Sequence, residues 1–201
     1  MNSQKDTLIY VIKQIGANLF SGKSVLNVSL PVNIFESRSL LERCAASFGK
    51  GPEYLMPVAD CDPLQQMKNI VTFIATIPTL ELLMQKPFNP ILGETFQAYI
   101  KGIPIYYEQI SHHPPISSYY MTCPEFTLYG NLVAFADVSF NSAVGGNEGV
   151  MHIIMRNGTH FQCYFPPSQI TGLIFGDRQF RGYGRGYVLE KKERMFAEFS
   201  I

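Results

Sequence analysis

The chain has 201 residues, enough for one large domain with a hydrophobic core. Its 16 lysines and arginines balance its 16 aspartates and glutamates. This zero net charge argues against a nucleic-acid partner, because phosphate binding normally requires a basic excess. Hydrophobic residues make up 46% of the chain and charged residues only 16%, against about 25% in average soluble proteins. The low fraction of charged residues predicts extra apolar surface that is buried, lines a cavity or faces a membrane.

The first predicted helix starts near Asp6 and ends before Gly22. Such an amphipathic helix usually packs on a core, but it is also typical of a mobile cover over an apolar cavity or of a membrane-surface contact. The apolar residues on its one side are Leu8, Ile9, Val11, Ile12, Ile15, Leu19 and Phe20.

An extended segment is expected over residues 25–32, followed by a second helix over residues 37–48. Asp62 and Pro63 then indicate the start of a third helix, because Asp caps helices well and Pro suits the first helical position. This helix is expected to run from residue 64 to about residue 74.

After residue 93 the pattern becomes short and strand-like, with a glycine-rich loop expected at Gly145 and Gly146. The fold class is therefore α+β and mainly β, with helices followed by an antiparallel sheet. The predicted strands cover residues 95–100, 103–110, 117–122, 126–133, 133–140, 152–156, 159–165, 170–175, 183–189 and 195–201.

Asn157 and Gly158 give the strongest hairpin signal in the chain. A two-residue turn there would place Met155 opposite His160, and His152 and His160 would then lie on opposite faces. In that register the two histidines cannot share a metal ion, and no metal site is expected. Both faces of the hairpin carry apolar residues, which predicts a sheet covered by other elements or rolled around an apolar interior.

Two adjacent histidines, His112 and His113, precede Pro114 and Pro115. Because the residue before proline is biased toward an extended conformation and proline ends the ladder, the pair is expected at a strand end. From the residues alone, a structural role, anion binding and catalysis all remain open. No nucleophile elbow accompanies the pair, so no catalytic residue is assigned.

Upstream, Lys86 and Asn89 belong to an irregular segment with two prolines. A lysine ammonium and an asparagine amide are suitable donors to phosphate oxygens. The alternative is a capped loop with a solvated lysine.

Four widely spaced cysteines form no Cys-x-x-Cys pair, which indicates free thiols in a reducing compartment rather than a disulfide framework. No signal peptide is recognisable. The segment RGYGRGY at residues 181–187 resembles an RNA-binding tract, but a glycine-rich strand fits its context better.

Two motifs together resemble the signature of the oxysterol-binding protein family: NPILGE at residues 89–94 and EQISHHPP at residues 108–115. The resemblance extends from about residue 8 to the end of the chain. Supporting matches are SLPV at residues 29–32, Asp62-Pro63 with Met67, and GRGY at residues 184–187.

The resemblance implies an incomplete antiparallel β-barrel around an apolar tunnel, closed by an N-terminal lid. We expect one lipid-binding domain over residues 1–201. Within it, a lid covers residues 1–29, a helical region residues 30–88 and the sheet residues 89–201. Family domains generally continue further, so the chain resembles a C-terminally shortened version.

The resemblance also implies non-enzymatic lipid transfer: a sterol or other lipid is carried and exchanged for phosphatidylinositol 4-phosphate between membranes. By position, Lys86, Asn89, His112 and His113 hold the phosphoinositide head group. No cofactor or nucleic acid is expected, and the protein is expected to be cytoplasmic, with transient contact at membrane surfaces. The alternatives are a truncated lipid sensor or adaptor and a histidine-dependent hydrolase.

Overall fold

A computed structural model describes residues 32, 35–80, 86–172, 175–177 and 179–200 of the chain. The first predicted helix, with all seven apolar residues assigned to a lid, lies outside these residues. So does the extended segment, except for Val32.

The helical part begins with a short strand and then contains three helices. Strand β1 (Phe35–Ser39) leads into α2 (Leu40–Ser47), and α3 (Gly51–Leu55) continues into a 3-10 turn, η3 (Met56–Val58). The long helix α4 (Pro63–Leu80) follows. Among the described residues, no helix is long and apolar enough to span a bilayer.

Side-chain caps explain where α2 and α4 begin. The Ser39 hydroxyl accepts a hydrogen bond from the Leu41 amide at 3.3 Å, so α2 starts at Leu40 and not at residue 37 as expected. The Asp62 carboxylate accepts from the amides of Leu64 and Gln65, each at 3.1 Å, which confirms the predicted cap of α4. Helix α4 extends beyond the expected end near residue 74, and α3 was not predicted.

The described residues after α4 form a large antiparallel sheet, preceded by the short strand β2, which pairs with β1 in parallel. The sheet branches at β6, which pairs with β5, β7 and β8. The strands are β2 (Lys86–Phe88) in the small sheet, and in the large one β3 (Thr95–Ile100), β4 (Ile103–Ser111), β5 (Ile116–Thr122), β6 (Phe126–Val138), β7 (Ser142–Asn147), β8 (Met151–Met155), β9 (His160–Tyr164), β10 (Ser168–Thr171), β11 (Gln179–Gly182), β12 (Gly186–Glu190) and β13 (Met195–Phe199).

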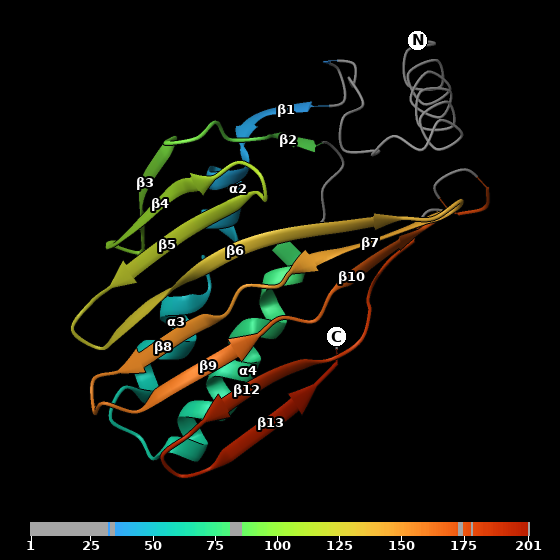
Figure 1. The fold of residues 1–201 in the computed structure, drawn as a ribbon. Helices are drawn as coiled ribbons and strands as arrows, with labels where there is room; N and C mark the ends of the chain where they lie inside the picture. The colour runs from blue at the N-terminus through green and yellow to red at the C-terminus, as the bar shows by residue number, and fades with distance from the viewer. Residues whose placement is uncertain (1–31, 33–34, 81–85, 173–174, 178, 201) are drawn as a thin grey trace.

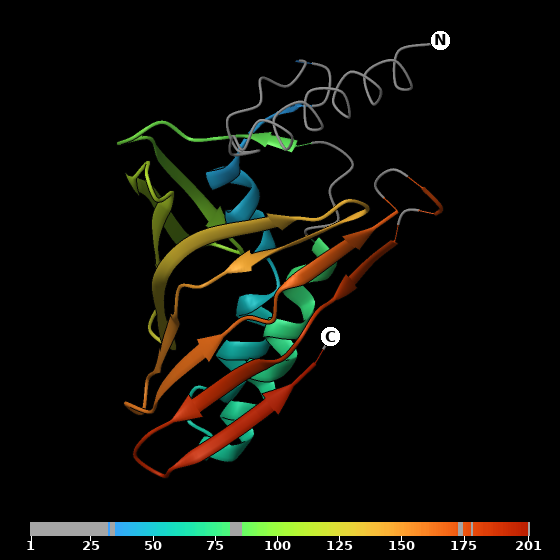
Figure 2. The ribbon, with the colours of Figure 1, turned by 45° about the vertical axis from the view of Figure 1, so that its right-hand side comes forward.

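The sheet curves around the helices, which cover its concave face (Figure 1, Figure 2). Inward-facing residues of the strands alternate with more exposed ones, as in β8, where Met151, Ile153 and Met155 are buried. They belong to one core with helical residues such as Ile70 and Phe73, which are fully buried. The described strands do not close into a barrel, which fits the predicted incomplete barrel.

Three predictions about the strands were wrong. The two strands expected over residues 126–140 are one continuous strand, β6. Gly145 and Gly146 belong to β7 and not to a loop. The tract at residues 181–187 is divided between the end of β11 and the start of β12, and β11 itself was not expected as a strand.

The register of the β8–β9 hairpin also differs from the prediction by one residue. Ile154, not Met155, lies opposite His160, because the turn contains three residues, 156–158. The Met155 amide donates to the Thr159 carbonyl at 2.9 Å, and Gly158 adopts a left-handed conformation with φ of 83°. This is the three-residue type of hairpin loop, in which a glycine after the turn forms a bulge.

Candidate functional site

His112 and His113 lie in the exposed turn between β4 and β5. Their ring centroids are 4.6 Å apart, with an interplanar angle of 63°. The prediction that the pair follows a strand end is confirmed. Both residues are exposed, so their imidazoles are accessible to a ligand outside the sheet.

Gln109, a buried residue of β4, stabilises this turn through side-chain hydrogen bonds. The residue is only 2% exposed, and its side-chain amide nitrogen donates to the Ser111 carbonyl at 2.6 Å. Its amide oxygen accepts a hydrogen bond from the hydroxyl of Ser117 across the hairpin. The register of β4 with β5 shifts between Gln109 and Ser111, and such irregularities redirect the chain, here just before the histidines.

The NPILGE loop lies against the same end of β4. The Gly93 amide donates to the Gln109 carbonyl at 2.9 Å, and the Gln109 amide donates to the Glu94 carbonyl at 2.9 Å. Gly93 has a φ of 79°, a left-handed conformation that favours glycine. These backbone hydrogen bonds bring the two sequence motifs together.

The Glu94 carboxylate stabilises the conformation of the NPILGE loop. One carboxylate oxygen accepts from the Ile91 amide at 3.1 Å, and the other accepts from the hydroxyl of Ser39 at the start of α2. Part of the motif therefore serves the fold of the loop. This role is not visible in the local sequence, because Ser39 lies 55 positions before Glu94.

Lys86 lies on the segment that leads into this loop, and Asn89 is the first residue of the loop. Lys86 opens β2, where its backbone pairs with Phe35 of β1, and Asn89 is exposed directly after the strand. The rings of Phe35 and Phe88 stack with centroids 4.8 Å apart and stabilise the strand pair. The segment of Lys86 thus continues into the loop of Asn89, which is bonded to β4 just before the histidines.

Exposed apolar side chains accompany the loop. Phe88, Ile91 and Leu92 are 46%, 71% and 64% exposed. A group of large exposed apolar side chains is typical of a surface that contacts a membrane or another protein.

A second histidine pair, missed by the sequence prediction, lies on the outer face of the sheet. The three-residue turn brings His152 and His160 onto the same face, with Nδ1 of His152 3.0 Å from Nε2 of His160. Burial lowers the pKa of His152, and the neighbouring His160 and Lys191 lower it further. In the part of the chain that the structure describes, no three histidine, cysteine or acidic side chains group to hold a metal.

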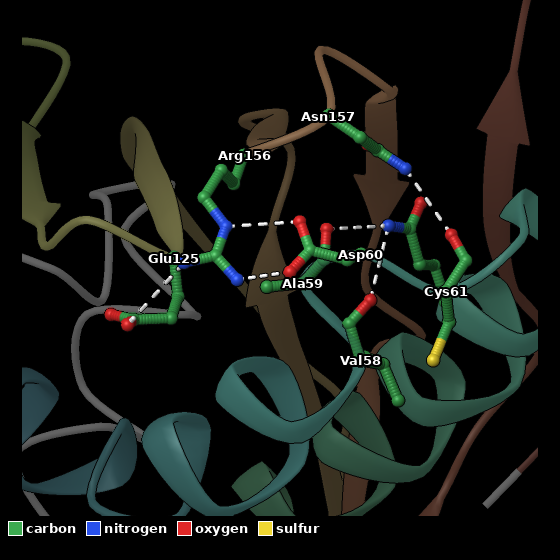
Figure 3. Close-up of polar contacts among 8 residues, drawn as sticks. Val58, Ala59, Asp60, Cys61, Glu125, Arg156 and Asn157 are labelled. Atoms are coloured by element: carbon green, nitrogen blue, oxygen red, sulfur yellow. Dashed lines mark hydrogen bonds and ion pairs between the residues drawn. The ribbon is translucent and has the colours of Figure 1, made fainter.

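The β8–β9 turn is tied to the helical layer, as Figure 3 shows. The Arg156 guanidinium forms two hydrogen bonds to the Asp60 carboxylate, one of them from Nε at 2.9 Å, and its Nη1 lies 4.0 Å from the Glu125 carboxylate. The Asn157 amide donates to the Cys61 carbonyl at 3.2 Å. The hydrogen bond from Arg156 lowers the pKa of Asp60.

A sequence profile described as oxysterol-binding protein matches residues 12–200. The chain belongs to the oxysterol-binding protein family. Oxysterol-binding protein 9 of Dictyostelium discoideum is 31% identical over 202 residues, which cover 98% of this chain and 47% of the relative. The oxysterol-binding protein-like protein OBPa of Candida albicans is 29% identical, covering 95% of this chain and 47% of its own length.

Solved structures of this family share the fold. The Osh1 ORD domain in complex with cholesterol matches with a TM-score of 0.82 and 25% identity, over 94% of this chain and 48% of that chain. The same domain in complex with ergosterol gives a TM-score of 0.76 and 27% identity, over 84% and 42% of the two chains. The chain therefore spans about half the length of these two curated relatives and of the cholesterol-bound Osh1 domain.

Proposed function

We propose that this oxysterol-binding protein family member binds and transfers lipid without enzymatic chemistry. Its cargo is a sterol or another lipid, exchanged for phosphatidylinositol 4-phosphate between membranes, and it works in the cytoplasm as a peripheral membrane protein. The head group is held by Lys86, Asn89, His112 and His113. The presence of ergosterol and cholesterol in the Osh1 complexes supports a sterol as cargo.

The observation that carries the proposal is the backbone pairing of Gly93 and Glu94 with Gln109. It joins the segment that carries Lys86 and Asn89 to the turn with two exposed imidazoles. A nearby anion stabilises the charged form of an imidazole, and a charged imidazole in turn binds the anion more strongly.

The exposed side chains of Phe88, Ile91 and Leu92 support transient membrane contact beside this site. They would enter the interfacial region while the polar residues next to them meet the lipid head group. We further propose that residues 1–29 act as the lid over an apolar tunnel. Burial of ring or acyl carbons at about 25 cal/mol per Å² then offsets extraction from the bilayer.

The test is incubation of the purified chain with liposomes that contain sterol, phospholipid and phosphatidylinositol 4-phosphate. The protein is then re-isolated, and bound lipid is identified by mass spectrometry. We expect stoichiometric lipid on the wild-type chain. A double variant, His112→Ala with His113→Ala, should bind phosphatidylinositol 4-phosphate about tenfold less, the loss typical of one or two charge-assisted hydrogen bonds, and should keep the other lipid.

The matched control is the double variant His152→Ala with His160→Ala, which removes two histidines from the outer face of the sheet and should keep both lipids. Loss of neither lipid from the first variant would refute the head-group assignment. A folded wild-type chain without any lipid would refute the carrier proposal, and bound lipid without movement between liposomes would show a sensor.

A further inference from the structure

We propose that His152 and His160 form a binding site for a divalent transition-metal ion, with imidazole as both protein ligands. The two rings come from neighbouring strands, β8 and β9, and lie diagonally across the pair. The nitrogens that face each other, Nδ1 of His152 and Nε2 of His160, are 3.0 Å apart. The site is independent of the lipid function proposed above.

The separation of the nitrogens matches metal coordination. A metal–imidazole bond is about 2.0–2.1 Å long, so two nitrogens on one ion at bond angles of about 90–110° lie roughly 2.9–3.4 Å apart. Without a metal, one of the two facing nitrogens carries a proton and donates a hydrogen bond to the other. On metal binding, that nitrogen releases its proton to water, and the far nitrogen of the same ring takes one proton from water. Both facing nitrogens then become ligands, and each imidazole stays neutral.

A neighbouring aromatic side chain packs against the ring of His152 and orients it. Tyr129 of β6 lies opposite His152 and stacks on it, with centroids 4.9 Å apart and an interplanar angle of 12°. The charge of exposed Lys191 opposes a cation, but it is carried on a long solvated side chain and is screened by salt.

Two protein ligands leave the remaining coordination positions to water. Imidazole is a good ligand for Ni²⁺, Cu²⁺ and Zn²⁺, and a pair of this kind discriminates against Mg²⁺ and Ca²⁺, which prefer oxygen. The site is therefore expected to exchange its ion readily.

The experiment is a calorimetric titration of the untagged 201-residue chain with Ni²⁺. We expect one saturable site, and about tenfold weaker binding in each of His152→Gln and His160→Gln, because each variant loses one of two ligands. The matched control, His112→Gln with His113→Gln, should keep the affinity of the wild-type chain. Circular dichroism checks that each variant is folded.

A second measurement does not depend on the variants. Electron paramagnetic resonance of the wild-type chain with one equivalent of Cu²⁺ should show coupling to two imidazole nitrogens. The proposal is overturned if the wild-type chain shows no saturable Ni²⁺ binding, if the outer-face variants bind as well as the wild type, or if the control variant is the one that loses the ion.

Discussion

At the scale of single residues, Arg156 joins parts of the chain that are far apart in sequence. It contacts Asp60, 96 positions earlier, and both side chains are largely exposed. Exposed pairs contribute little on average, but two parallel hydrogen bonds to one carboxylate are the favourable geometry. The pair holds the β8–β9 turn against the helical layer.

This pair gives a prediction about acid. Because Arg156 lowers the pKa of folded Asp60, the stabilisation is complete above the unfolded value of about 3.9 and is lost as the pH falls through the folded value. Asp60→Asn should therefore lower the melting temperature at neutral pH, and the difference from the wild type should shrink steadily below about pH 4. The control is Asp177→Asn, at an exposed aspartate, and an equal effect in both variants would contradict the prediction.

At the scale of elements, β6 connects the two branches of the sheet. Its first half pairs with β8 and its second half with β7. Between the halves, the side-chain oxygen of Asn147 accepts hydrogen bonds from the amides of Val133 at 2.8 Å and Gly149 at 2.7 Å. One side chain thus satisfies two backbone donors where the ladder changes partner.

Removal of this side chain should destabilise the branch point. Asn147→Ala leaves two partly buried amides without this acceptor and is expected to cost about 1–3 kcal/mol of unfolding free energy, measured by urea denaturation. Asn131→Ala, at an exposed position of β6 near the same junction, should have a clearly smaller effect. Equal losses would show that Asn147 does not hold the branch.

At the scale of the whole molecule, one core connects the helices to the concave face of the sheet. Phe73 of α4 is fully buried and lies edge-on to Phe48, with ring centroids 6.1 Å apart. Phe48 in turn packs against Tyr107 of β4 and Tyr119 of β5. The aromatic contacts therefore run without interruption from α4 to the sheet.

Truncation of a side chain in this core should lower the unfolding free energy of the whole molecule. Phe73→Ala is expected to cost about 3–5 kcal/mol of unfolding free energy, because it leaves a large cavity between α4 and its neighbours. Phe196→Ala is the control, since that residue is 57% exposed. A single cooperative transition in urea with a lower midpoint for Phe73→Ala alone would agree with the prediction, and similar midpoints for both variants would contradict it.

The head-group site combines local and long-range determinants. The strand-end position of His112 and His113 followed from the prolines next to them. The partners of Glu94 and Gln109 could not be predicted from local sequence, because Ser39 and Gly93 reach them only when α2, the loop and β4 pack together. Long-range hydrogen bonds of this kind depend on the folded chain and not on the spacing of residues.

The sequence by itself determined the family, the mainly β fold and the cap of α4, because these depend on motifs and on interactions within a few residues. Asp62 shows this, since its cap acts on the next turn of the chain. Only the tertiary structure decided the pairing of His152 with His160. The physical reason is that their register depends on whether the turn has two or three residues, and Asn157-Gly158 is compatible with both.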